Sequence, residues 1–126
     1  MSEMRYSAQV TELFDEAYGA LSADEGLPAL SGAAGDRARG CRIQFFADVA
    51  EGNITRLRYL AYACPHVIAA CSLVVKELEG GELSKAFVLE PTDLMRFLEI
   101  PAEKAGKMLI LQDALLECCR AAKAAD

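Results

Sequence analysis

The sequence predicts an α+β fold, with a small antiparallel sheet of about three strands and helices packed on one of its faces. Apolar residues recur at helical spacing near the N-terminus, two central segments alternate with a period of two, and the C-terminal half returns to helical spacing. The two alternating segments are joined only by Glu51–Asn53. Strands joined so briefly must run antiparallel.

The size and composition indicate one globular domain over residues 1–126, because a single hydrophobic core serves a chain of this length. The hydrophobic fraction of 53% excludes a disordered chain. A net charge of -6 with scattered basic residues argues against a nucleic-acid partner. Neither a secretion signal nor a membrane-spanning run is visible, so we expect a cytoplasmic protein whose five cysteines are thiols.

The first helix is expected over residues 6–19, with Ser7 as its N-cap, because its apolar positions recur at spacings of three and four. Residues 22–40 are rich in glycine, alanine, serine and proline and lack periodicity over most of their length. They predict a mobile loop, with room for a short strand near residues 28–30.

The later elements follow from alternation, proline positions and glycine terminators. We expect strands at 41–49 and 54–63, a helix from Cys64-Pro65 to Gly80-Gly81, a short helix at 83–89, a helix capped by Thr92 and running through Leu98, and a last helix opened by Pro101.

Cys64 is the candidate reactive residue, because it stands where a strand ends and a helix begins. Free amide groups and the positive end of the helix dipole favour a thiolate there, and a thiolate binds soft metals or attacks sulfur. His66 is near enough in the first turn to assist as a ligand or base. The alternatives are a packed thiol at Cys64 and a solvated or capping side chain at His66.

The other cysteines give weaker signals. Cys71 shares the apolar stripe of its predicted helix, which favours core packing. Cys118 and Cys119 are adjacent on a helix and diverge by about 100° around its axis, so they cannot both point into one site.

Several segments resemble the NifU/IscU family of iron-sulfur cluster assembly scaffolds. The most specific is Ala63–Leu73 with the following residues 74–83, in which a cysteine opens a helix of small residues. Tyr6-Ser7, Pro91–Leu94 and Met108–Leu115 resemble other family segments. Ile100–Lys104 resembles the stretch by which the family contacts an Hsp70-type chaperone. The resemblance therefore spans nearly the whole chain and implies a SufE/NifU-like fold.

The resemblance implies a function without enzymatic turnover. Such scaffolds accept sulfur as persulfide from a cysteine desulfurase, gather iron, hold a [2Fe-2S] cluster and release it to recipient proteins. Their ligands are three cysteines helped by an aspartate or histidine, and only Cys64 matches one of these cysteines directly.

The other ligand positions have changed. Ala33–Asp36 matches the family's alanine-cysteine-glycine-aspartate, with alanine at the ligand position and Asp36 kept. In an alignment without an insertion, Cys41 falls a few residues past that ligand, either as a substitute or as a strand-edge residue of no consequence. Gly106-Lys107 matches the family's histidine-cysteine pair, and a lysine ammonium has no lone pair for iron. Lys107 could instead pair with Asp36 or hold Cys64 as thiolate.

Three hypotheses follow. In the first, the chain is a divergent scaffold that binds a [2Fe-2S] cluster, iron or zinc through Cys64, Asp36, Cys41 and His66, or carries sulfur on Cys64. In the second, it is an adaptor or regulator that binds cysteine desulfurase without holding a cluster. In the third, Cys64 accepts persulfide as SufE-like proteins do.

Overall fold

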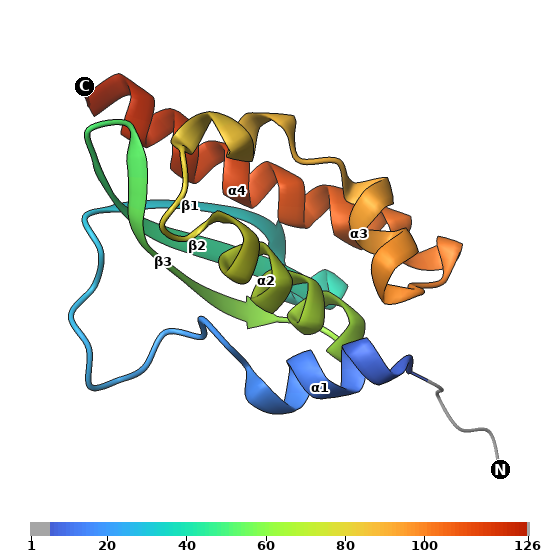
Figure 1. Cartoon of the computed structure of the whole chain (residues 1–126). Helices are drawn as coiled ribbons and strands as arrows, with labels where there is room; N and C mark the ends of the chain where they lie inside the picture. The colour runs from blue at the N-terminus through green and yellow to red at the C-terminus, as the bar shows by residue number, and fades with distance from the viewer. Residues whose placement is uncertain (1–5, 126) are drawn as a thin grey trace, which may run out of the picture.

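The computed structural model describes residues 6–125, with the backbone alone at residues 124 and 125. Its elements, in chain order, are α1 (Ala8–Glu16), β1 (Leu30–Asp36), η1 (Arg37–Arg39), β2 (Cys41–Ala50), β3 (Asn53–Tyr62), α2 (Pro65–Leu78), η2 (Leu83–Val88), α3 (Pro91–Leu98), η3 (Ala102–Lys104) and α4 (Ala105–Ala125), where η marks a 3-10 helix (Figure 1).

The strands form one antiparallel sheet in the order β1-β2-β3. Helix α4 lies against β1 and β2, α2 against β3, and α1 against α2 (Figure 1). This arrangement confirms the predicted α+β fold with its three-stranded sheet. None of the helices within residues 6–125 combines the length and the apolarity that crossing a membrane would require.

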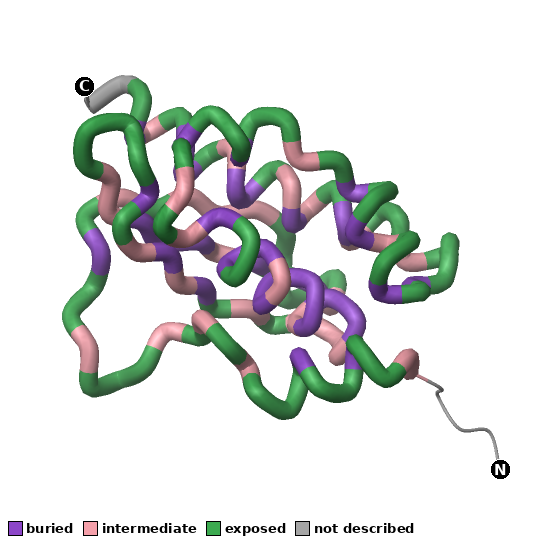
Figure 2. The backbone as a smooth tube through the Cα atoms, in the orientation of Figure 1, coloured by how far each residue is buried: buried purple, intermediate pink, exposed green. Residues whose placement is uncertain are grey.

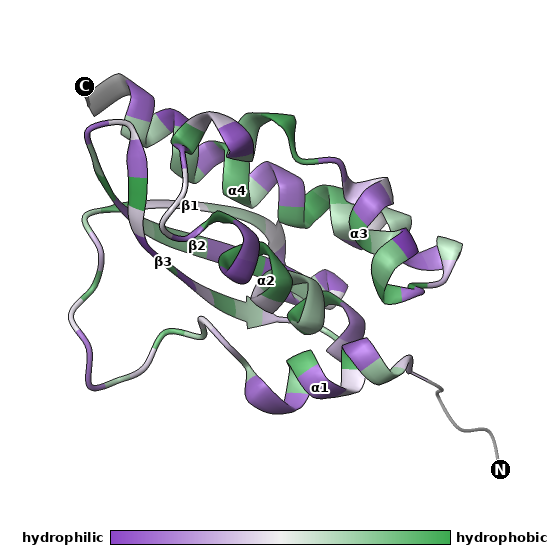
Figure 3. Ribbon diagram, viewed as in Figure 1, coloured by the Kyte–Doolittle hydropathy of each residue, from purple (hydrophilic) through white to green (hydrophobic). Residues whose placement is uncertain are grey.

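The core lies between the sheet and its helices. Alternate residues of β2, beginning with Cys41, Ile43 and Phe45, are buried against the inner side of α2 and α4. Figure 2 shows buried residues gathered along α2 and the strands, and Figure 3 shows that α2 is also rich in hydrophobic residues. Burial of the apolar side chains on the inner side of α2 is the main force that holds this helix on the sheet.

Strand β1 is longer than the sequence predicted. Residues 30–36 pair along β2, whereas the pattern indicated a loop with a short strand near residues 28–30. Glycine and alanine give no alternation of polar and apolar side chains there. They do allow close contact, because a Cβ added at Gly32 would lie 2.1 Å from the backbone nitrogen of Cys118 in α4.

The first helix begins where predicted, and the third does not. Ser7 caps α1, and its Oγ accepts a hydrogen bond from the backbone N–H of Val10 at 3.2 Å. Thr92 lies inside α3, whose N-cap is Glu90 and whose first residue is Pro91. Proline suits the first helical position, because its missing N–H has no partner there. Pro101 precedes η3, which leads into α4.

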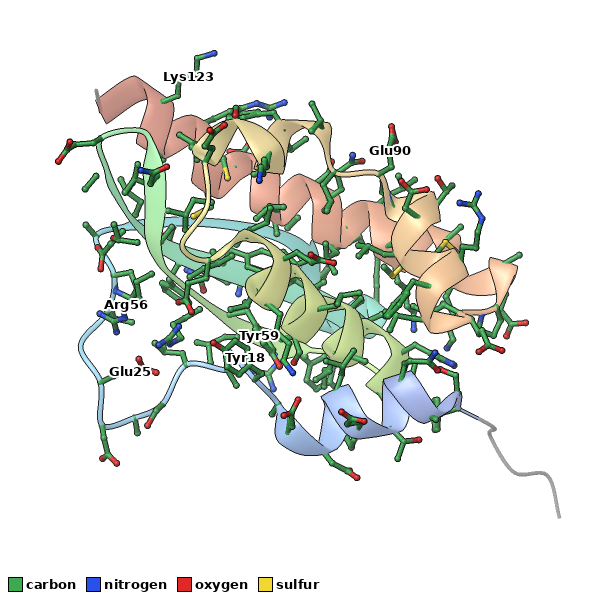
Figure 4. All side chains as sticks on the ribbon, in the orientation of Figure 1. Tyr18, Glu25, Arg56, Tyr59, Glu90 and Lys123 are labelled. Atoms are coloured by element: carbon green, nitrogen blue, oxygen red, sulfur yellow. The ribbon has the colours of Figure 1, made fainter. Side chains whose placement is uncertain are left out.

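The connection between α1 and β1 runs beside β3 and is tied to it. The backbone N–H of Tyr59 donates to the carbonyl of Gly19, and that of Leu21 to the carbonyl of Tyr59, each at 2.9 Å. Glu25 forms ion pairs of 3.1 Å with both Arg56 and Arg58. Figure 4 shows Glu25 on this connection near Arg56 of β3. The connection therefore covers one edge of the sheet.

Candidate functional site

Cys64 lies between the end of β3 and the start of α2, as the sequence predicted. It is the N-cap of α2, with extended backbone (φ -78°, ψ 166°) and a half-buried side chain. Its carbonyl accepts hydrogen bonds of 3.0 Å from the N–H groups of Val67 and Ile68. The thiol itself makes no capping hydrogen bond, which leaves its sulfur available for chemistry.

Cys41, the first residue of β2, lies beside Cys64. The last pair between β2 and β3 joins Arg42 with Tyr62, and one further step of this register sets Cys41 across from Ala63. Cys41 is only 2% exposed. Burial raises the pKa of the Cys41 thiol. The nearby Lys107 ammonium lowers this pKa, and a Cys64 thiolate would raise it further.

Lys107 completes this group from the first turn of α4, where its side chain is half-buried. Three parts of the chain thus bring Cys41, Cys64 and Lys107 together, and we call this group the thiol site. The resemblance placed a ligand cysteine at position 107. The ammonium group supplies positive charge there but has no lone pair for a metal.

Asp36 lies at the rim of the thiol site. It ends β1 opposite Cys41, and its Oδ1 accepts a hydrogen bond of 2.9 Å from the backbone N–H of Ala38. It forms no ion pair with Lys107 within the described part of the chain. Its carboxylate is therefore engaged in capping η1.

The backbone around Gly35, the residue before Asp36, requires a glycine. Gly35 has φ +90°, and a Cβ there would lie 2.2 Å from the carbonyl oxygen of Cys41. Only glycine adopts this backbone at low cost so close to another strand. Ala34, which the resemblance matched to a ligand position, pairs with Ile43 within the sheet and packs against the core.

His66 belongs to different surroundings. It is 2% exposed, and its ring meets that of Tyr6 edge to face, with 4.6 Å between centroids. Neither ring nitrogen has a hydrogen-bond partner within residues 6–125. Burial lowers the pKa of His66, Lys104 lowers it further, and Glu103 opposes both. The charges that act on His66 are thus those of η3, whereas those acting on Cys41 come from Cys64 and Lys107.

The stretch resembling the chaperone contact lies beside His66. Ile100 is buried, and Pro101, Ala102 and Glu103 are exposed. The apolar anchor of this stretch therefore packs inside the protein, while the proline and the acidic residue face solvent.

The four predicted metal ligands do not come together. In the part of the chain that the structure describes, no three histidine, cysteine, aspartate or glutamate side chains are grouped so that they could hold a metal ion. A [2Fe-2S] cluster requires four ligands. The thiol site, with two thiols and an ammonium group, does not fit a complete cluster on one chain.

The remaining cysteines are part of the core, as the apolar stripe of its helix indicated for Cys71. Cys71, Cys118 and Cys119 are at most 1% exposed. Burial raises the pKa of Cys118 to about 12 and that of Cys119 to about 11. The sequence hypothesis made Cys41 a co-ligand of Cys64, and the strand register places the two residues at the same end of the β2–β3 pair.

Comparison with known proteins adds a family match. The profile of a family described as the NifU-like N terminal domain matches residues 5–124. A segment of 65 residues is 34% identical to the iron-sulfur cluster assembly scaffold protein IscU of Escherichia coli K12 and covers 52% of this chain. This segment spans only about half (51%) of that relative, so the match does not show that this chain has the activity of the whole relative.

Solved structures show the same fold at low sequence identity. A NifU-like N-terminal protein from Brucella abortus superposes with a TM-score of 0.71 at 14% identity, covering 95% of each chain. The putative scaffold protein for the SUF system from Fervidobacterium islandicum reaches 0.68 at 9% identity, covering 90% of this chain and 96% of that one.

Proposed function

Because this chain belongs to the family of the NifU-like N terminal domain, we propose that it is a scaffold-like carrier in iron-sulfur cluster assembly that accepts sulfur on Cys64. Family membership confirms the resemblance found in the sequence. The observation that supports sulfur carriage most directly is the half-buried thiol of Cys64, which makes no capping hydrogen bond and lies near Cys41, in a site with too few ligands for a cluster.

The chemistry needs one reactive thiol. The Cys64 thiolate attacks the outer sulfur of a persulfide on a cysteine desulfurase, and the desulfurase cysteine leaves as thiolate. The product is a Cys64 persulfide. The ammonium group of Lys107 favours the anions that take part in this exchange. The chain acts here as a carrier, so it needs no turnover of its own.

The proposal includes the predicted setting of the protein. We propose a single domain acting in the cytoplasm, with a cysteine desulfurase as sulfur donor. An Hsp70-type chaperone is a second proposed partner, which would contact the exposed residues Pro101–Glu103.

Sulfur acceptance is tested on the Cys41→Ala variant, in which Cys64 is the one cysteine left in the thiol site. After incubation with a cysteine desulfurase and cysteine, mass spectrometry should find one added sulfur atom on Cys64. The matched control is the variant that also carries Cys64→Ser, which should gain none. An unchanged mass of the Cys41→Ala variant, or equal gain in both variants, would reject the proposal.

Cluster or metal binding is a separate hypothesis, with [2Fe-2S], iron and zinc as the cargo to be tested. Anaerobic reconstitution with iron and sulfide should give wild-type protein without a thiolate-to-iron absorption band, because one chain groups fewer than three ligands within its described residues. A strong band that Cys64→Ser removes would instead identify a cluster-holding scaffold.

An adaptor role is the second candidate, favoured by the lysine at position 107 where the resemblance placed a ligand. An adaptor that binds the desulfurase without taking sulfur should keep its affinity in Cys64→Ser and gain no sulfur in any variant. Titration of the desulfurase with both proteins, followed by fluorescence anisotropy, distinguishes this role from sulfur carriage.

A further inference from the structure

We propose that Cys41 is the resolving thiol of the thiol site, which displaces sulfide from a Cys64 persulfide and forms a Cys41–Cys64 disulfide. This inference rests on the proposed function, because it begins from sulfur bound to Cys64. It assigns a role to Cys41 and identifies the form, sulfide, in which the sulfur leaves.

The strand register brings the two cysteines to the same end of the β2–β3 pair, and the charge of a Cys64 thiolate acts on Cys41. Facing residues of antiparallel strands have Cα atoms about 4.5 to 5.5 Å apart. Cys41 is set across from Ala63 by the β2–β3 register, and Cys64 is the next residue, where the chain turns into α2. A disulfide bridges Cα separations of up to about 7 Å. The end of this strand pair is therefore a suitable place for a disulfide.

Burial gives the two cysteines different roles. The half-buried Cys64 can meet a donor, whereas Cys41, at 2% exposure, cannot be reached by a second protein. Cys41 is thus confined to reaction with its neighbours. Cys71 is also near Cys41 but is completely buried on the core side of α2, away from any donor.

The chemical step balances without an added oxidant. The Cys41 sulfur attacks the Cys64 Sγ, an S–S bond forms between them, and the bond from Cys64 Sγ to the outer sulfur breaks. The outer sulfur leaves with the electron pair of that bond and combines with the proton of Cys41 and its own as hydrogen sulfide. The outer sulfur is reduced to sulfide while the cysteine pair is oxidised to a disulfide.

A dithiol reductant then restores the two thiols for the next cycle. The positive charge of Lys107 beside Cys41 favours the departing hydrosulfide anion. Sulfide is the oxidation state of sulfur in iron-sulfur clusters. Cys41 would therefore allow the chain to deliver sulfur in that state without an external electron donor during release.

The test uses the full-length protein and glutathione persulfide, a donor that needs no recognition by a partner protein. Wild-type protein should release one hydrogen sulfide per chain above the donor-only blank. Its mass should fall by two hydrogen atoms, and peptide mapping should find the Cys41–Cys64 disulfide. Cys41→Ala should release no sulfide above the blank and should gain one sulfur atom on Cys64.

Cys119→Ala is the matched control, because it removes another buried thiol of the core, and it should behave as wild type. Cys41→Ser should repeat the result of Cys41→Ala, and circular dichroism checks that both variants are folded. The wild-type disulfide map tests the inference even if neither variant folds.

The outcomes separate the two proposals. A wild-type protein that keeps the added sulfur without forming a disulfide, or that forms a disulfide between Cys64 and Cys71, overturns the role of Cys41 but leaves sulfur acceptance intact. No added sulfur on Cys41→Ala and no disulfide in wild type overturns both proposals.

Discussion

At the first turn of α2, His66 has surroundings that oppose its charged form. The ring is buried against Tyr6, and neither nitrogen has a hydrogen-bond partner within the described residues. A protonated imidazole would also lie close to the Lys104 ammonium. Sequence proximity to Cys64 suggested an assisting ligand or base, but the helix turns this side chain toward Tyr6 and η3.

We expect His66 to destabilise the fold at mildly acidic pH. Its pKa in the folded protein is lowered from an ordinary value of about 6.5, so between the two values the unfolded chain binds more protons. Stability is therefore complete above about pH 7 and falls as the pH drops below about 6.5. Urea unfolding at a series of pH values measures this loss.

His66→Leu should reduce this loss of stability, because a leucine side chain does not take up a proton. His66 is the only histidine of the chain, so the difference between the two pH profiles below about pH 6.5 can be assigned to it. Two profiles that fall in parallel would show that burial of His66 carries no pH-dependent cost.

Among the elements, β1 and α4 are in close contact at Gly32. A Cβ on Gly32 would lie 2.1 Å from the nitrogen of Cys118 and 2.6 Å from the carbonyl carbon of Glu117. Both are backbone atoms, which cannot move aside as a flexible side chain can. The absence of a side chain, which hid β1 from sequence patterns, is what allows the strand to lie against this helix.

Gly32→Ala should lower the free energy of unfolding by about 1 to 3 kcal/mol, the range for added atoms in a packed core. Chemical denaturation measures the change. Gly26→Ala is the matched control, because a Cβ there meets nothing within 4 Å, and it should change stability by less than about 1 kcal/mol. Equal effects at the two glycines would contradict the close contact of β1 with α4.

The C-terminal end of α2 is joined to β3 by Glu79. Its Oε2 accepts hydrogen bonds from the backbone N–H of Leu57 at 2.9 Å and from Arg58 at 2.6 Å. The hydroxyl of Tyr18 donates to Oε1 at 3.4 Å. One carboxylate therefore links the helix, the strand and the connection after α1.

Glu79→Ala should cost about 1 to 2 kcal/mol of unfolding free energy, because it removes hydrogen bonds to a charged, partly buried group. Glu77→Ala, an exposed position on the same helix with no ion pair within the described residues, should change stability by less than about 0.5 kcal/mol. Thermal unfolding compares the two variants. A cost at position 77 equal to that at 79 would refute this role of Glu79.

Across the whole molecule, burial divides the five cysteines. Cys41, Cys71, Cys118 and Cys119 lie in the core, and Cys64 alone is half-buried. Burial also raises the pKa of each of the four core thiols and so disfavours their reactive thiolates. A thiol reagent should therefore distinguish Cys64 from the others.

One thiol per folded chain should react quickly with iodoacetamide. The other four should react at least about a hundredfold more slowly, because the reagent reaches them only when the structure opens. Mass spectrometry over time counts the labels. Cys64→Ser should remove the fast phase, and urea should make all thiols of either protein react. A fast phase that persists in Cys64→Ser would show that a core cysteine is open to solvent.

The sequence by itself determined the order of elements, the Ser7 cap, the junction at Cys64 and the family. Each of these depends on near neighbours in the chain: a periodicity, a capping side chain, a proline at the start of a helix, or a contiguous motif around Cys64. Such local signals act before any distant segment is in place.

Only the tertiary structure decided the extent of β1, the direction of His66 and the grouping of Cys41, Cys64 and Lys107. Strand β1 has no apolar alternation of its own and exists because β2 pairs with it and α4 lies against it. The thiol site joins residues from β2, the β3–α2 junction and α4. Their proximity depends on strand register and on helix packing across the sheet, which a local pattern does not specify.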